Sequence, residues 1–193
     1  MKKTLISILC ILALVLSLSA CTLPTNDELP RTLSDYAAQQ YDSYTVQIVT
    51  ESPNGGKTTE TYEVTVANGI RTANCCREQI NPFIIEGNVI TPPEEYMTVQ
   101  EYTVSVGIGE TTAFGLPGFR FTEDAVSNLT CNTEVFPYTF KCNVISTEKF
   151  MQDSIDFKTM TVEGEYVVGS LYHIQLRYTT TDNHTVTVTY TYN

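Results

Sequence analysis

The sequence predicts a mainly β fold: a single antiparallel, meander-type curved sheet, or a sandwich or half-barrel, with two or three short helices. The composition favours strands, because the chain holds 30 threonines and 12 tyrosines but only eight alanines and no tryptophan. Thr, Tyr and Val suit a pleated, half-buried surface, whereas strong helix formers are scarce. Apolar and polar residues alternate over several segments, and turn-forming residues separate these segments.

The amino end has the pattern of a secretory signal. Two lysines precede an uncharged apolar run over residues 5–18, and small residues follow it,. The run is shorter than the ~20 apolar residues that a membrane-spanning helix needs. It ends in the motif Leu18-Ser19-Ala20-Cys21, which resembles the lipobox of bacterial lipoproteins.

This resemblance implies that residues 1–20 are removed and that the sulfur of Cys21 receives a diacylglycerol group. The protein is then expected at the bacterial cell envelope, anchored by lipid to the extracytoplasmic face of a membrane. Two or more acyl chains are enough for stable anchoring. An ordinary cleaved signal, which would leave Cys21 as a plain thiol, is the alternative.

The mature chain is expected to form one domain behind a short tether. Residues 21–32 contain two prolines and little apolar content, which predicts a lipidated tether. Residues 33–193 are long enough for a single β-rich domain with its own core. Loss of the signal removes two lysines and no acid, so the formal net charge falls from −11 to −13. A domain this acidic is repelled by nucleic acid, which we therefore exclude as a partner.

Four cysteines remain after the anchor: Cys75, Cys76, Cys131 and Cys142. An exported, oxidising compartment favours disulfides. Adjacent cysteines rarely bridge each other, so we favour the two connectivities in which Cys75 and Cys76 pair with Cys131 and Cys142. The third connectivity joins Cys131 to Cys142 and leaves an adjacent pair. Free or redox-active thiols and a metal site are alternatives, although the sequence has no C-x-x-C spacing,.

The domain is expected to begin with a short helix and a meander. Apolar residues recur at helical spacing over residues 33–41, with Thr32 or Ser34 as the N-cap,. Apolar and polar residues then alternate in three segments that predict strands. These strands cover residues 44–49, 58–67 and 70–75. Turns rich in Pro, Asn and Gly connect them,.

The middle of the chain predicts shorter elements. These are strands at 83–85 and from 89, a helical turn at 94–99, and a strand to residue 108. A loop rich in glycine and proline follows. Its apolar residues either plug the end of the core, which we favour, or form a lid or rim over a pocket. They are Phe114, Leu116, Phe119 and Phe121.

The last third predicts a turn of helix, a hairpin, a short helix and a long sheet. The elements are a helical turn at 124–128, a hairpin of 130–135 with 138–145, a helix at 146–155, and strands at 165–180 and 185–192. The apolar side chains of the last two strands lie on the same face of the sheet only if the numbers of paired residues add up to an even value. This predicts a three-residue loop, Asp182-Asn183-His184, with Thr181 opposite Thr185. Because the last strand has no charge or proline, it is either paired on both sides or its free edge binds something.

The sequence shows no catalytic motif. It lacks a G-x-S-x-G elbow, a P-loop and H-E-x-x-H,. The only two histidines, His173 and His184, fall in a predicted strand and a predicted loop, and carboxylate pairs such as Glu163 and Glu165 lack the spacing of a calcium loop,. We therefore expect no enzymatic activity, cofactor or metal.

Two functions remain. The first is non-catalytic binding of a small hydrophobic ligand, since a curved sheet with helices on its concave face can enclose an apolar pocket. The order of helix, meander and long strands loosely resembles the half-barrel of periplasmic lipoprotein carriers, as a fold-level analogy. The second is a structural or protein-interaction module that contacts an envelope protein through an edge strand.

Overall fold

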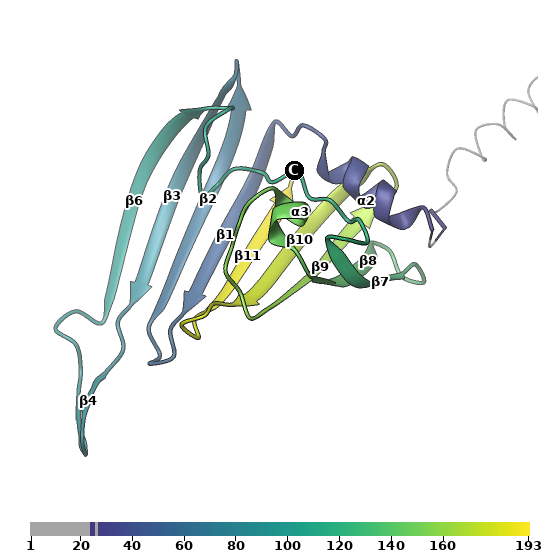
Figure 1. The fold of residues 1–193 in the computed structure, drawn as a ribbon. Helices are drawn as coiled ribbons and strands as arrows, with labels where there is room; N and C mark the ends of the chain where they lie inside the picture. The colour runs from purple at the N-terminus through teal and green to yellow at the C-terminus, as the bar shows by residue number, and fades with distance from the viewer. Residues whose placement is uncertain (1–23, 26) are drawn as a thin grey trace, which may run out of the picture.

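The computed structural model describes residues 24, 25 and 27–193. The predicted signal peptide, the lipobox Leu18-Ser19-Ala20 and the lipidation site Cys21 lie outside these residues. The described part is mainly β, as predicted (Figure 1).

Nine strands of the described residues form one antiparallel sheet, in the order β6-β3-β2-β1-β11-β10-β9-β8-β7. The edge strands β6 and β7 do not pair with each other, so the sheet is not a closed barrel. A separate hairpin of β4 (Ile84–Glu86) and β5 (Val89–Thr91) extends from the β3–β6 connection. The strands of the main sheet are β1 (Ser43–Glu51), β2 (Lys57–Ala67), β3 (Ile70–Ile80), β6 (Met97–Gly107), β7 (Val126–Asn132), β8 (Tyr138–Val144), β9 (Thr159–Val167), β10 (Ser170–Thr179) and β11 (Thr185–Tyr192).

The first and last strands pair at the middle of the sheet. Tyr44 of β1 lies opposite Tyr192 of β11, and this ladder runs on to Glu51 and Thr185. β11 also pairs with β10 along its other side. The uncharged terminal strand is therefore paired on both sides, which is the first of the two predicted alternatives, and it offers no free edge.

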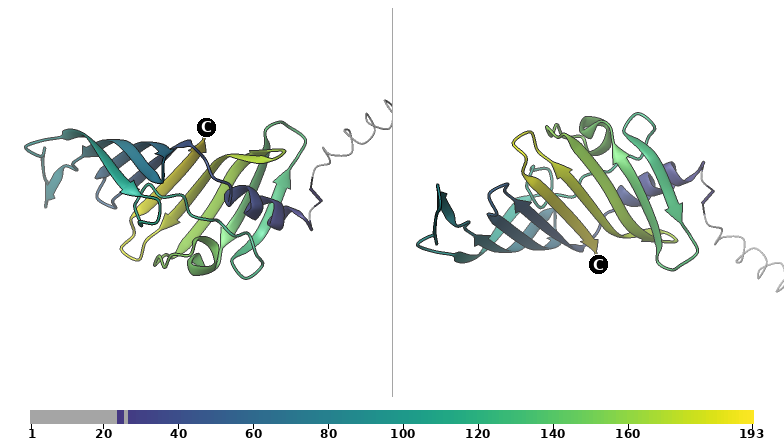
Figure 2. Two further views of the ribbon diagram at one scale, coloured as in Figure 1. Left: turned by 90° about the horizontal axis from the view of Figure 1, so that it is seen from above. Right: turned by 90° about the horizontal axis from the view of Figure 1, so that it is seen from below.

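The core lies between the sheet and three segments that cover one of its faces. These segments are α2 (Leu29–Ala37), α3 (Thr147–Met151) and residues 108–125, which connect β6 to β7 and which we call the strap (Figures 1 and 2). We call this side of the sheet the covered face and the other side the open face. Side chains alternate between the two faces along each strand. The buried apolar residues of the core all fall between Leu29 and Tyr192.

α2 begins four residues before the predicted helix and ends at Ala37. Leu29, Leu33 and Ala37 are buried at helical spacing, so burial of this stripe fixes the helix start,. Pro30 is tolerated because it occupies the first turn,. Residues 29–32 thus belong to the domain rather than to the tether. Tyr41 lies beyond the helix, and its ring packs 4.4 Å from that of Tyr192.

The predicted long strand at 165–180 is wrong, because the chain reverses at Val168-Gly169. Gly169 has φ +97°, and Val167 pairs with Ser170 across this tight turn,. A β-bulge between Leu171 and His173 then shifts the register. The bulge buries Leu171 and leaves Tyr172 53% exposed, so Tyr172 does not lie on the buried face with Ile174.

The helical turn predicted at 94–99 is wrong, and the one predicted at 124–128 lies two residues earlier, where the Val126 amide donates to the Thr122 carbonyl at 2.9 Å. β6 starts at Met97 and pairs with β3 along its whole length, and β7 starts at Val126. The ladder satisfies more backbone groups than a single helical turn could. The helix after Ser146 is confirmed but ends at Met151, because Gln152 adopts a left-handed conformation. The last hairpin pairs Thr179 with Thr185. The two residue numbers add up to an even value, as predicted, but Thr185 pairs with Thr179 and not with Thr181.

Candidate binding site under the strap

All four described cysteines are free thiols, so the predicted disulfides are not formed. Cys75 and Cys76 lie on β3, whereas Cys142 lies on β8, with five strands between β3 and β8. At about 4.8 Å per strand this separation is roughly 29 Å, well beyond the roughly 7 Å between Cα atoms that a disulfide tolerates. The order of strands, which spacing in the sequence did not reveal, rules out these pairings.

The remaining cysteine contacts are local. Cys131 Sγ lies 3.0 Å from the Tyr166 hydroxyl. Burial raises the pKa of the Cys142 thiol to about 12, so this group stays protonated at neutral pH,. Within the described residues, no group of three or more His, Cys, Asp or Glu side chains could hold a metal ion.

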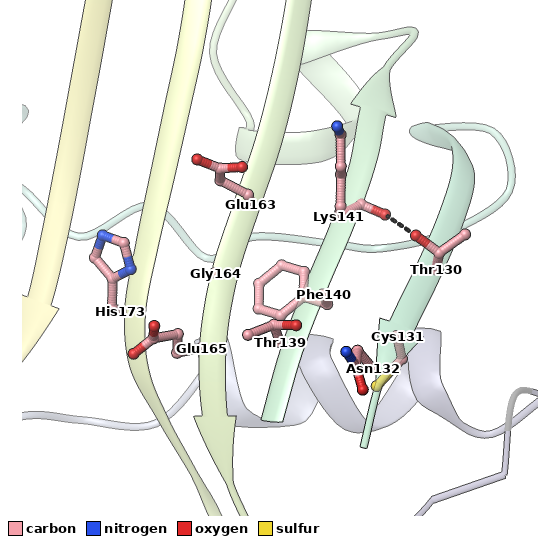
Figure 3. Close-up of a pocket in the computed structure, with 10 residues that line it drawn as sticks. All are labelled: Thr130, Cys131, Asn132, Thr139, Phe140, Lys141, Glu163, Gly164, Glu165 and His173. Carbon is pink, nitrogen blue, oxygen red and sulfur yellow. Dashed lines mark hydrogen bonds between the residues drawn. The ribbon is translucent and has the colours of Figure 1, made fainter. Parts of the chain in front are cut away.

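A polar hollow of about 440 Å³ lies on the open face over β7 to β10 (Figure 3). Lys141 lies opposite Glu163, and Glu165 lies opposite His173, on neighbouring strands. These side chains form cross-strand neighbours on a solvated sheet surface. Cys131 is directed to Tyr166, which is buried on the covered face. Its thiol and the His173 ring therefore do not form a nucleophile–base pair.

The strap creates another hollow, on the covered face, whose lining residues are mostly apolar or aromatic. This strap hollow has a volume of about 230 Å³. Its floor is made by side chains of β1, β10 and β11, and its roof by Ala113, Gly115 and Pro117. The apolar and aromatic residues of its floor and its α3 side are Ile48, Leu176, Tyr178, Val188, Tyr190, Met151 and Ile155.

A neighbouring hollow of about 310 Å³ extends toward Arg71 and Ile108. The two hollows share five lining residues, among them Thr112, Gly115 and Pro117. They therefore adjoin beneath the same short piece of chain. Because Gly115 has no side chain and the Pro117 side chain is small, the strap is thin where it roofs the hollow.

The strap is fixed to the fold on both sides of this thin piece. The Tyr44 hydroxyl donates to the Phe114 carbonyl at 3.0 Å, and the Phe121 amide donates to Ser34 Oγ at 2.9 Å. The Arg120 amide donates to the Phe150 carbonyl of α3 at 2.8 Å. These bonds hold the roof at a set height above the sheet.

The phenylalanines of the strap fill the core, as favoured by the sequence. Phe114 packs against Tyr62, Phe119 against Phe150, and Phe121 against Phe140 and Phe150. All three strap phenylalanines are buried, whereas Leu116 is half-buried. None of the four residues predicted as a possible rim lines the strap hollow, whose roof is formed by Ala113, Gly115 and Pro117 instead. The closeness of Gly115 and Pro117 in the sequence was the available signal.

Polar groups enter the strap hollow at a few points. Thr112 Oγ1 is buried and has no hydrogen-bond partner among the described residues. Burial, and secondarily the Asp153 carboxylate, raises the pKa of the Tyr178 hydroxyl. Burial likewise raises the pKa of Tyr190. Both phenols therefore remain neutral at physiological pH, and Asp153 provides the negative charge at this site.

Comparisons with family models, curated proteins and solved structures found no match to this chain. None of the helices in the described residues is both long and apolar enough to cross a membrane.

Proposed function

We propose that the protein is a lipid-anchored lipoprotein of the bacterial envelope that binds a small hydrophobic ligand without catalysis. The lipobox resemblance at Leu18-Ser19-Ala20-Cys21 supports the anchor. The strap hollow supports the binding role, because it is an apolar space between a sheet and a fixed roof,. In this proposal the sheet serves as an open half-barrel, and the strap and α3 hold the ligand against it.

The single observation that carries the binding role is the lining of the strap hollow. Ile48, Val188 and Leu176 lie side by side on β1, β11 and β10 and form a continuous apolar floor. Ligand pockets for drug-sized molecules measure about 300–1,000 Å³. A hollow of about 230 Å³ suits a smaller molecule, such as one aromatic ring system or a short acyl chain.

The polar groups of the strap hollow restrict the chemistry of the ligand further. Thr112 lines the hollow, and its hydroxyl has no hydrogen-bond partner among the described residues, so a rotation of this side chain toward a ligand would break no hydrogen bond within the protein. The Asp153 carboxylate at the same site disfavours an anionic ligand,. The proposed ligand is therefore an apolar body with one neutral or cationic hydrogen-bonding group.

A neutral fluorescent probe tests this role. The probe is 1-naphthylamine, a single fused aromatic ring system with one neutral amino group, added to the mature chain (residues 21–193) carrying Cys21→Ser so that no acyl chain competes. Val188→Phe fills the floor of the strap hollow and should lower the affinity for the probe at least about tenfold, since it removes most of the apolar contact,.

The matched control is Thr187→Phe, which adds the same ring to the next residue of β11 on the open face,. This variant should bind the probe like the parent chain. Equal affinity of the parent and Val188→Phe would place the probe elsewhere and refute the binding role of the strap hollow.

A further inference from the structure

The hairpin between β3 and β6 is the most apolar exposed part of the described structure. Six of the 16 exposed large apolar side chains among the described residues fall between residues 83 and 96. We call residues 81–96, which include β4 and β5, the arm. Ile85 and Ile90 lie opposite each other near its tip and are 69% and 68% exposed. Soluble monomers rarely expose large apolar surface without a use for it.

The arm lies clear of the main sheet, yet it is an ordered element. Figures 1 and 2 show it projecting past the end of β3 and β6 in three views. At its base, the Asn81 amide donates to the Tyr96 carbonyl at 2.9 Å, and Asn81 Nδ2 donates to the Glu95 carbonyl at 2.8 Å. The rings of Phe83 and Tyr96 pack 5.9 Å apart. These contacts close the base and leave the isoleucines of the tip uncovered.

The charge of the arm itself has one sign, and the lysine opposite Ile80 near its base, Lys57, pairs with Glu51. Residues 78–119 contain six glutamates and no lysine, arginine or histidine. Three of these glutamates, Glu86, Glu94 and Glu95, belong to the arm itself. An apolar tip with an acidic rim complements an apolar groove bordered by lysine and arginine side chains.

The negative charge of the arm disfavours two other partners for such a surface, a lipid membrane and a second copy of this chain. Anionic lipid headgroups would repel the glutamates. A second copy of this chain would bring two acidic arms together, and like charges across an interface are unfavourable. We propose that the arm is a docking element for a protein partner whose apolar groove is rimmed by basic residues. This goes beyond the proposed ligand binding and does not depend on the strap hollow.

Two synthetic helices of defined chemistry test the proposal. One has leucines along one face and lysines elsewhere, and the other is identical except that glutamates replace the lysines. Each is titrated into the mature chain carrying Cys21→Ser. The leucine–lysine helix should bind, and the double substitution Ile85→Ser with Ile90→Ser should lower its affinity at least about tenfold, because two exposed apolar anchors are lost. Glu94→Gln with Glu95→Gln should lower it several-fold.

Matched controls separate the arm from the acidic surface at large. Val135→Ser removes an equally exposed apolar side chain from another loop, and Glu163→Gln with Glu165→Gln removes two charges from the open face. Each control should change the affinity less than about twofold. Controls that weaken binding as much as the arm variants would overturn the proposal, as would equal binding of the leucine–glutamate helix.

Two further measurements test the alternatives that the arm binds a lipid membrane or a second copy of this chain. Phosphatidylcholine vesicles, with and without phosphatidylglycerol, are tested for binding by sedimentation, and the mass of the chain in solution is measured by analytical ultracentrifugation. Neither vesicle binding nor dimerisation should depend on Ile85 and Ile90. Vesicle binding lost in the Ile85→Ser, Ile90→Ser variant would replace the protein partner by a membrane, and a dimer dissociated by it would replace the partner by a second copy.

Discussion

Gly164, in the middle of β9, illustrates how a single residue sets the packing of the core. A Cβ atom at this position would lie 2.6 Å from Cζ of Phe140 and 2.5 Å from the carbonyl oxygen of His173. Phe140 lies opposite Gly164 on β8, and its ring is buried against Phe121 of the strap. Because Gly164 has no side chain, the Phe140 ring can lie over β9 and pack against the strap,.

Gly164→Ala should destabilise the fold by about 1–3 kcal/mol, the usual cost of overpacking a tight core. The measurement is the free energy of unfolding in urea. Gly109→Ala is the control, because a Cβ there meets nothing within 4 Å, and its effect should stay within about 0.5 kcal/mol. A Gly164→Ala variant as stable as the parent would show that the Phe140 ring can move aside freely.

Elements differ in how well the sequence predicts them. The first two strands of the meander were predicted closely, because alternation and the Asn68-Gly69 turn both indicate strands, and Asn68 and Gly69 indeed take positive φ. The third strand was predicted to end at residue 75 but runs on to Ile80, paired with β2 and β6. The early start of α2 was missed because Leu29 becomes informative only once it packs in the core. The split of the long strand at Gly169 was missed because Val167 and Val168 continue an apolar run. A glycine after such a run was the unused signal.

The candidate site depended on contacts that alternation cannot reveal. The sequence drew attention to the strap through its phenylalanines and its glycine and proline content. It could not place Ile48 beside Val188, since these residues are far apart in the chain and meet only because β1 pairs with β11. The same distant pairing separates β3 from β8 and so prevents the predicted disulfides.

At the scale of the whole molecule, buried thiol and phenol groups lower the stability of the fold at alkaline pH. Burial raises the pKa of Cys142 to about 12, and it also raises the pKa values of Tyr190 and Tyr192 above their ordinary range. Above pH about 9–10 these groups would ionise in the unfolded chain but stay protonated in the folded one. The unfolded state then binds fewer protons, so stability falls as pH rises.

The free energy of unfolding should therefore fall between neutral pH and pH about 10.5, measured by urea titration at each pH. Tyr190→Phe removes one of the groups and should make this fall shallower. A constant stability over the same range, or the same slope in the Tyr190→Phe variant, would contradict the burial of these groups.

We propose above all that the chain is a lipid-anchored protein of the bacterial envelope. The intact mass of the protein purified from the membranes of its native host tests it most directly. We expect a chain that begins at Cys21 and carries the added mass of a diacylglycerol group with any further acyl chain. A chain that begins at Cys21 with an unmodified sulfur, or one that keeps residues 1–20, would contradict the claim.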